Sequence, residues 1–406
     1  MAAEGGRVTF ARFMELALTH PTDGYYSRAR RLLGPRGDFT TAPRISPAFN
    51  GAVGRLLEEL IDGALASSGG PEGDHATLVE LGAGEADLAK ALLARWTRGR
   101  PDLRGRLGYV IVEVGGALRG RQLRRLAKFR DEGWDVRWAR SPEEAMTGTG
   151  ATIFVGNEFV DALPVHLVDV RGPVPLEAWV RLEGAEAGVA AREEWDALST
   201  EAATELEELF GTADAEVLRE VTQDGVVELR PAAGRLLRQA ASRGSSACVL
   251  TVDYGEWFAT LATAGHECPD PEPVSAPLGR RSVRGYFKHE LVTDPYVRVG
   301  RQDLTADVDF RALDHHGRRL GFETVLYTTL SGLLRADGAD HQLEKLQIAA
   351  ARPTQRALQS DRQASVLEKL LDERGLGGVF KVMLQVREAR TRRNRPPRSV
   401  EVRDSR

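Results

Sequence analysis

The chain has 406 residues, a formal net charge of −4, and 28% charged and 42% hydrophobic residues. This length exceeds that of one ordinary domain, and the slightly acidic balance excludes the basic surface typical of nucleic-acid-binding proteins. Two cysteines, no apolar run that could span a bilayer and no signal-peptide core at the start predict a soluble protein of the cytoplasm.

The N-terminal region predicts two helices separated by a polar loop. Thr9 can cap an amphipathic helix that ends at His20-Pro21, and Ser46-Pro47 opens the next helix. The long polar segment between them contains Asp38. Long loops often carry function, so Asp38 could close over a cofactor, although a turn-forming aspartate explains it equally well.

The segment 76–90 organises the rest of the chain. A short apolar run ends near Glu80, a turn with Gly82 and Gly84 follows, and then a helical pattern begins. A strand, a glycine turn and a helix are typical of the ligand-binding edge of a doubly wound α/β fold, although Gly-x-Gly alone can also be a plain turn. The dinucleotide fingerprint needs a third glycine or alanine where this chain has Asp87. An S-adenosylmethionine site needs only the strand-end acid and the first two glycines.

Two further strands bring polar residues to the same edge. The second strand of the core ends at Glu113, which could hydrogen-bond both ribose hydroxyls or be a solvated carboxylate. The fourth strand, over 151–155, leads into Asn157, Glu158 and Asp161, which we expect near the reactive end of the cofactor. Asn157 could bind the adenine or the acceptor, or cap the turn that follows.

The sequence after the fourth strand predicts an inserted module, followed by further strands of the core sheet. We expect a helix over 228–242, a buried strand over 247–253 and a closing strand over 378–386, with Asp303 and Asp307 capping a helix. The predicted parts are N-terminal helices with a lid loop (1–75), an S-adenosylmethionine-binding Rossmann-like core (76–164), an inserted substrate or dimerisation module (165–226), the rest of the core sheet with C-terminal helices (227–390), and a disordered tail (391–406).

Polar islands in a fixed order carry a resemblance to a known family. They are Gly24-Tyr25-Tyr26, Gly37-Asp38-Phe39, Glu80-Leu-Gly-Ala-Gly84, Asn157-Glu-Phe-Val-Asp-Ala-Leu-Pro164, Asp253-Tyr-Gly255, Arg284-Gly-Tyr286 with His289, and Gln302-Asp-Leu-Thr-Ala-Asp-Val-Asp-Phe310. From Phe10 to about Tyr327 the chain resembles the MidA family of class I S-adenosylmethionine-dependent methyltransferases. That family includes a mitochondrial complex I assembly enzyme that acts on a protein arginine. The resemblance therefore implies S-adenosylmethionine as cofactor and a protein arginine as acceptor.

Two departures from the family pattern lie in or near the expected site. Arg44 stands where the family usually has a glutamate, and Ala86 stands where it has a glycine. The reversed charge at Arg44 bears on the substrate more than on the fold, and Ala86 could crowd the cofactor.

The chemistry of an arginine acceptor indicates which residues we expect to be catalytic. A guanidinium has a pKa above ~12 and stays charged, so a carboxylate pair would orient its planar fork and receive the positive charge. Glu158 and Asp161, three positions apart on a helical turn, are the expected pair, and the alternative for Glu158 is a charge that complements a helix N-terminus. His289 could accept a proton or be structural. We expect no metal, because the histidines lack metal-ligand spacing.

Other functions stay open. The chain could methylate a small molecule or another side chain, or it could be a non-catalytic assembly factor that keeps the fold. A nicotinamide dehydrogenase is disfavoured by Asp87. The expected partners are a protein substrate, by analogy a respiratory complex I subunit, and a second copy of the chain in a homodimer. Neither nucleic acid nor a membrane span is expected.

Overall fold

An eight-stranded sheet lies at the centre of the computed structural model, which describes residues 6–27, 42–67, 75–146, 150–183, 190–222, 225–242, 246–258, 281–352 and 355–388. Its strands are β2 (Ala76–Leu81), β3 (Leu107–Val112), β4 (Asp135–Ala139), β5 (Thr152–Asn157), β10 (Ala247–Glu256), β14 (Val308–Asp309), β15 (Glu323–Thr329) and β16 (Phe380–Arg387). They follow the order β15-β16-β10-β5-β2-β3-β4, and β14 pairs with the end of β10.

The direction of the strands defines where a ligand can bind. β16 runs antiparallel to its neighbours β10 and β15, whereas β4, β3, β2, β5 and β10 are mutually parallel. The chain adds β3 and β4 on one side of β2 and then places β5 on the other side. This reversal of strand order creates a crevice at the carboxyl ends of β2 and β5. The strand order and directions agree with the expected doubly wound α/β fold.

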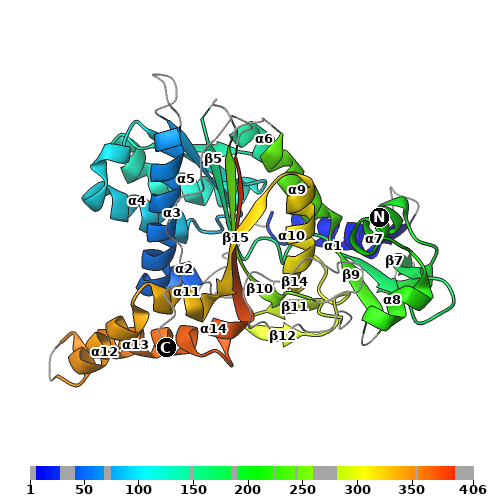
Figure 1. Ribbon diagram of the computed structural model, residues 1–406. Coiled ribbons are helices and arrows are strands. Elements are labelled where there is room, and N and C mark those ends of the chain that lie inside the picture. The colour runs from blue at the N-terminus through cyan, green and yellow to red at the C-terminus, as the bar shows by residue number, and fades with distance from the viewer. Residues whose placement is uncertain are drawn as a thin grey trace.

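Helices cover both faces of the central sheet (Figure 1). Neighbouring residues of a strand point to opposite faces, so Leu78 packs with Leu92 on one face while Val79 packs with Leu237 and Phe310 on the other. The first face carries α3 (Pro47–Ser67), α4 (Asp87–Gly99), α5 (Gly116–Asp131), α11 (Leu330–Ala336) and α13 (Ala357–Leu371), and the second carries α6 (Pro142–Ala145), α9 (Pro231–Ala241) and α10 (Phe310–Arg319). Both sides of β2 are therefore buried, which explains its almost continuous apolar sequence.

A second, antiparallel sheet forms from the insertion and the start of the chain. It contains β1 (Arg7–Thr9), β6 (His166–Asp169), β7 (Leu176–Glu183), β8 (Ala190–Asp196) and β9 (Val226–Leu229), and it lies beside α7 (Thr200–Phe210) and α8 (Ala215–Val221) (Figure 1). The helix expected over 228–242 begins later, because residues up to Leu229 pair with β6 and Pro231 occupies the first helical turn.

A small third sheet precedes α10. It contains β11 (Arg284–Phe287), β12 (Glu290–Val292) and β13 (Asp303–Thr305). The expectation that Asp303 and Asp307 cap the next helix is wrong. Asp309 is the capping residue, and its carboxylate accepts hydrogen bonds from the N–H groups of Arg311 and Ala312.

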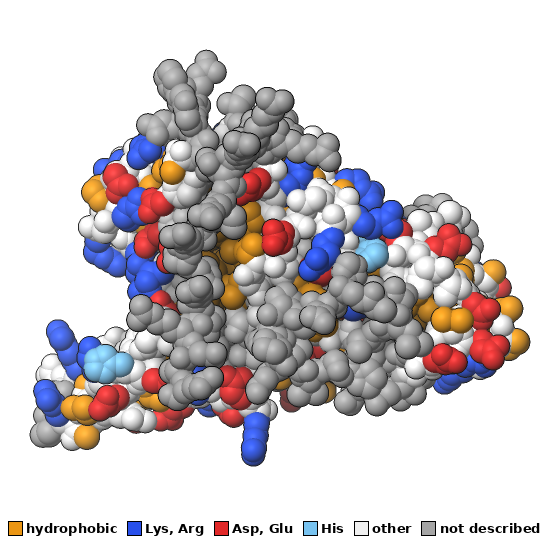
Figure 2. Space-filling view, viewed as in Figure 1, with side chains coloured by type: hydrophobic (Ala, Val, Ile, Leu, Met, Phe, Trp, Pro, Cys, Tyr) orange, Lys and Arg blue, Asp and Glu red, His pale blue; other side chains and the backbone are white. Residues whose placement is uncertain are grey.

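The remaining described elements lie around this core. They are α1 (Phe10–Thr19), α2 (Ala42–Ile45), the 3₁₀ turn Pro101–Leu103, α12 (Ala339–Ala350) and α14 (Leu376–Val379). α12 and α13 extend together from the body of the molecule (Figure 1). Acidic and basic side chains alternate over the described surface in Figure 2, with no broad patch of one sign on this face. None of the helices in the described ranges combines the length and apolarity needed to cross a bilayer.

His166 joins the second sheet to α7 and to the core. Its ring nitrogens lie 2.6 Å from Glu177 Oε1 and 3.4 Å from Glu201 Oε2, and Glu201 also pairs with Arg235 of α9. Burial alone would lower the pKa of His166, but the hydrogen bonds to the two glutamates raise it to about 9. The ring is therefore a cation held between two carboxylates at neutral pH.

This charged contact predicts that stability declines above neutral pH. The pKa of His166 is about 9 in the folded protein and 6.5 in an unfolded chain. Protonated His166 therefore stabilises the fold fully below pH 6.5, and this stabilisation is lost as the pH rises through 9. The free energy of unfolding should fall by up to about 3 kcal/mol over this range. Denaturant unfolding between pH 6 and 9.5 measures this decline. His166→Gln should flatten it and His341→Gln, which replaces an exposed histidine of α12, should not; equal slopes in the wild type and His166→Gln would contradict this assignment.

Candidate active site

A cavity of about 680 Å³ opens at the switch point of the central sheet. Six of the residues expected at the site line it, namely Glu80, Gly82, Gly84, Glu113, Asn157 and Glu158. They come from the ends of β2, β3 and β5 and from the turn after β2. The cavity also reaches α1, α7 and α9, so the N-terminal helix and the insertion contribute to its walls. Asp38 lies outside the described residues.

The turn after β2 requires glycine. Gly82 and Gly84 have φ values of +63° and +51°, in the left-handed region that residues with a Cβ adopt only with strain. A Cβ on Gly82 would also lie 2.6 Å from Cδ2 of Phe159. Ala86, the residue immediately before α4, has φ 58° although it carries a Cβ. Glycine, the residue that the resemblance places there, would adopt this conformation freely.

The two strand-end glutamates are held by polar partners. Glu80 is buried and accepts a hydrogen bond of 2.8 Å from the hydroxyl of Tyr109, and burial raises its pKa to about 7. Glu113 accepts hydrogen bonds from the Gly115 N–H at 2.7 Å and from the Gln122 amide at 3.1 Å. Burial raises the pKa of Glu113, while these donors lower it. Both carboxyl groups are therefore fixed in orientation at the edge of the cavity.

Gln122 is a site residue that we did not predict. It is fully buried, and its amide also donates to the Gly84 carbonyl at 2.8 Å, so it ties the glycine turn to Glu113. The sequence does contain a signal for it. Gln122 lies between Leu118 and Leu126, four residues away on each side, on the apolar face of α5. A lone amide on such a face is unusual unless it is hydrogen-bonded.

Asp253 fixes the loop that follows β5. Its Oδ2 atom accepts hydrogen bonds from the backbone N–H groups of Phe159, Val160 and Asp161 at 3.2, 2.9 and 3.1 Å. Asp253 has no exposed surface and comes from the neighbouring strand β10. The loop begins at Glu158 with φ 51°, a conformation that costs of order 1–3 kcal/mol in a residue other than glycine. These three hydrogen bonds hold the strained loop in place.

The expected carboxylate pair is divided between two layers. Glu158 lines the cavity, and burial together with the charge of Asp161 raises its pKa to about 8. Asp161 lies one layer deeper, where Oδ2 accepts a hydrogen bond from the Tyr254 hydroxyl and Oδ1 has no hydrogen-bond partner within the described ranges. Asp303, which is also buried, adds a further negative charge close enough to raise the pKa of Glu158. Three acidic side chains therefore converge on one end of the cavity.

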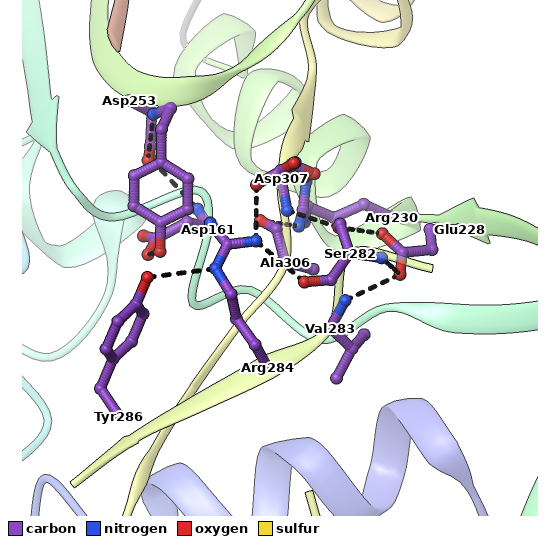
Figure 3. A network of polar contacts seen from close by, with 11 residues as sticks. Asp161, Glu228, Arg230, Asp253, Ser282, Val283, Arg284, Tyr286, Ala306 and Asp307 are labelled. Carbon is purple, nitrogen blue, oxygen red and sulfur yellow. Dashed lines mark hydrogen bonds and ion pairs between the residues drawn. The ribbon is translucent and has the colours of Figure 1, made fainter. Parts of the chain in front are cut away.

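A polar network continues behind this acidic end. Figure 3 shows Asp161 and Asp253 on one side and Arg284, Asp307 and Glu228 on the other. Arg284 donates to Asp307 Oδ1 at 2.7 Å. The guanidinium of the nearby Arg230 donates to three backbone carbonyls, those of Leu163, Ala306 and Asp307, at 3.4, 2.9 and 3.1 Å. The two arginines place positive charge beside the buried acids and lower the pKa of Asp161, which burial raises.

Two further residues of interest lie elsewhere. His289 lies in the exposed turn between β11 and β12 with φ 65°, so the structure does not bring it to the cavity. Arg44 of α2 lies 3.5 Å from the carboxylate of Asp87, which also pairs with Arg125. The reversed charge at Arg44 is thus balanced by an acid in the first turn of α4.

One histidine has acidic neighbours that its sequence position does not indicate. His316 Nε2 lies 2.8 Å from Glu205 Oε1, and His316 Nδ1 lies 3.9 Å from Glu208 Oε2. One histidine nitrogen and one carboxylate oxygen from each glutamate, atoms of the kind that can bind a metal ion, lie within 4.8 Å of one another. Glu208 also pairs with Arg319 at 3.2 Å, so ion pairs between α7 and α10 account for this cluster.

Comparisons with known proteins identify the class. Residues 64–328 match the model of a family of S-adenosyl-L-methionine-dependent methyltransferases. The chain belongs to this family. A Burkholderia thailandensis candidate methyltransferase, crystallised with S-adenosyl-homocysteine, is 27% identical with a TM-score of 0.70, and the similarity covers 96% of this chain and 90% of that one. A second crystal structure from the same organism is 26% identical with a TM-score of 0.68. The cofactor is therefore S-adenosylmethionine, and the resemblance to MidA methyltransferases is confirmed.

Curated relatives carry more specific names. The Caenorhabditis elegans protein arginine methyltransferase NDUFAF7 homologue is 26% identical over 324 residues, which are 75% of this chain and 67% of that protein. The human protein arginine methyltransferase NDUFAF7 is 26% identical over 328 residues, which are 76% of this chain and 65% of that protein. Both are named as mitochondrial proteins, so the expectation of a cytoplasmic protein is wrong.

The glycine turn generates a test of the cofactor site. Gly82→Ala should weaken binding of S-adenosyl-homocysteine at least about tenfold, because the new Cβ strains the backbone and displaces Phe159 from the cavity wall. Isothermal titration calorimetry measures the affinity, and circular dichroism shows whether the variant is folded. Gly63→Ala in α3, where a Cβ meets nothing within 4 Å, is the matched control and should bind like the wild type. Wild-type affinity in folded Gly82→Ala would refute this assignment of the turn.

Proposed function

We propose that this methyltransferase modifies an arginine side chain of a protein substrate. The observation that carries the proposal is the acidic end of the cavity, where Glu158 in the wall is backed by the buried Asp161 and Asp303. This arrangement favours a cation at the acceptor position. The curated relatives named as protein arginine methyltransferases support the same acceptor.

A guanidinium suits these residues chemically. It remains protonated at any physiological pH, so the acceptor enters as a cation that a carboxylate must neutralise. Its planar N–H fork matches a carboxylate in a bidentate arrangement. We assign this contact to Glu158, which also takes up the proton that the acceptor nitrogen releases when it gains a methyl group. Asp161 acts from behind by adding negative charge.

The cofactor supplies an activated methyl group on a positively charged sulfur. We assign its binding to the glycine turn, where backbone N–H groups before α4 suit its carboxylate, and to Glu113, which is oriented to accept hydrogen bonds from ribose hydroxyls. Asn157 and Glu80 complete this end of the cavity. Alignment of the acceptor with the methyl group is then the main task of the protein.

The finer identity of the substrate rests on the family resemblance. We propose a respiratory complex I subunit as the first candidate, and a homodimer stays a prediction from the sequence. The small-molecule alternative depended on Arg44. Because Arg44 pairs with Asp87, its charge does not oppose a cationic acceptor, and the structure gives this alternative no separate support.

Glu158 generates a test by pH. Its pKa of about 8 means that the carboxylate, which binds the acceptor, forms in the free enzyme only as the pH rises through 8. The kcat/KM for an arginine-bearing protein substrate should therefore rise between pH 7 and 9 and then level. Glu158→Gln should lower kcat/KM about 100-fold and remove this pH dependence.

The matched control is Glu256→Gln. Glu256 also ends a strand of the central sheet but pairs with Lys381 at 3.0 Å, away from the cavity, so its loss should leave activity and pH profile unchanged. Methylation is measured by mass spectrometry of the protein product. Modification of another residue type, or an active Glu158→Gln enzyme with an unchanged pH profile, would count against the proposal.

A further inference from the structure

Tyr26 links the N-terminal region to the third sheet. It follows α1, its N–H donates to the Leu18 carbonyl at 2.9 Å, and the residue lines the cavity. Its hydroxyl donates to Asp303 Oδ1 at 2.8 Å, a contact between residues 277 positions apart. No role for Tyr26 follows from the methyltransferase fold alone.

Asp303 holds the Tyr26 hydroxyl from behind the cavity wall. It lies in β13, is 4% exposed and pairs across the sheet with Tyr286. The same segment is joined to the Glu158 loop by a hydrogen bond of 3.0 Å from the Ala306 N–H to the Asp161 carbonyl. The segment that carries Asp303 is thus held by pairing with β11 and by a hydrogen bond to the Glu158 loop. Asp303 can therefore fix the direction of the Tyr26 hydroxyl.

The backbone of Tyr26 lies near Glu113, the residue that we assign to the ribose of the cofactor. A Cβ on Gly115 would lie 3.0 Å from the Tyr26 carbonyl oxygen and 3.0 Å from Glu113 Oε1. The backbone of Tyr26 and the carboxylate of Glu113 therefore flank the same glycine. One residue spans the distance between the cofactor end and the acidic end of the cavity.

The hydroxyl chemistry indicates what Tyr26 can bind. A phenol has one proton to donate and oxygen lone pairs that accept. The proton is committed to Asp303, so a lone pair is left for a donor in the cavity, and the adjacent negative charge strengthens the oxygen as an acceptor. Burial and the charge of Asp303 raise the pKa of Tyr26, so the phenol keeps its proton. Its ring can in addition face a cation.

We propose that Tyr26 is an acceptor-binding residue whose phenol oxygen takes a hydrogen bond from the incoming guanidinium, with Asp303 as its positioning residue. Glu158 and Tyr26 then contact the cation from two walls, each backed by a buried aspartate. The inference rests on the proposed function for the identity of the cation. It also explains why the chain before the core is part of the site, since Tyr26 delivers this contact from outside the central sheet.

The test uses a small guanidinium probe and needs no turnover. N-acetyl-arginine amide is titrated into the full-length protein saturated with S-adenosyl-homocysteine, and N-acetyl-citrulline amide serves as a neutral probe of the same shape. The wild type should prefer the arginine probe. Tyr26→Phe should weaken arginine binding about tenfold, the loss expected for one hydrogen bond to a charged group, while the affinity for S-adenosyl-homocysteine changes less than twofold.

Asp303 is tested by conservative and non-conservative replacement. Asp303→Asn keeps an oxygen that accepts from Tyr26 and should lose part of the arginine preference, whereas Asp303→Leu should lose as much as Tyr26→Phe. Tyr296→Phe is the matched control, because Tyr296 also donates to a carboxylate, that of Glu193, but does not line this cavity. Its arginine affinity should equal that of the wild type.

The outcomes separate this inference from the proposed function. Equal binding of the arginine and citrulline probes by the wild type would overturn it. A Tyr26→Phe variant that behaves like Tyr296→Phe, or that loses both ligands equally, would also overturn it, since Tyr26 would then be a structural clip. Preferred arginine binding that depends on Tyr26, without methylation of any protein arginine, would support the inference and refute the proposed function.

Discussion

The site depends on one buried carboxylate. Asp253 ends up beside the loop after β5 because β10 is the neighbouring parallel strand, and its Oδ2 atom gathers three consecutive N–H groups of that loop. Without this one acceptor the three N–H groups would lose their hydrogen-bond partner, and nothing would hold Glu158 in its left-handed backbone conformation. The same contact sets Asp161 one layer behind Glu158.

The crowding of acids near the cavity is energetically unfavourable in itself. Burial and mutual repulsion raise the pKa of Glu158, and Arg230 and Arg284 offset part of the crowding by lowering the pKa of the neighbouring Asp161. Folded proteins retain crowded charges and strained backbone mainly at functional sites. The raised pKa of Glu158 and its left-handed backbone therefore both mark the acidic end of the cavity as functional. A cationic acceptor is the ligand that would relieve this crowding best.

The sequence predicts the parts of this structure that local patterns determine. Buried parallel strands have continuous apolar runs, and the glycine turn requires a left-handed backbone, so β2 and Gly82 can be predicted from the sequence alone. Contacts between distant segments leave no such pattern. Tyr26 meets Asp303 across 277 positions. His289 could accept a proton or be structural, and only the pairing of β11 with β12 places it in a turn away from the site. The prediction of the residue that caps α10 was wrong for a different reason. Three aspartates precede this helix, and only Asp309 lies immediately before its first residue.

The pairing of β1 with β7 has a consequence for how the chain is made. Arg7 lies opposite Arg181, so β1 must wait for more than 170 further residues to be synthesised before its partner strand exists. During that interval the apolar face of α1, including Phe10 and Phe13, has no core to cover it. Contacts of such long sequence separation slow folding and leave apolar surface exposed to aggregation. A nascent chain therefore leaves this apolar face uncovered until the insertion has been synthesised.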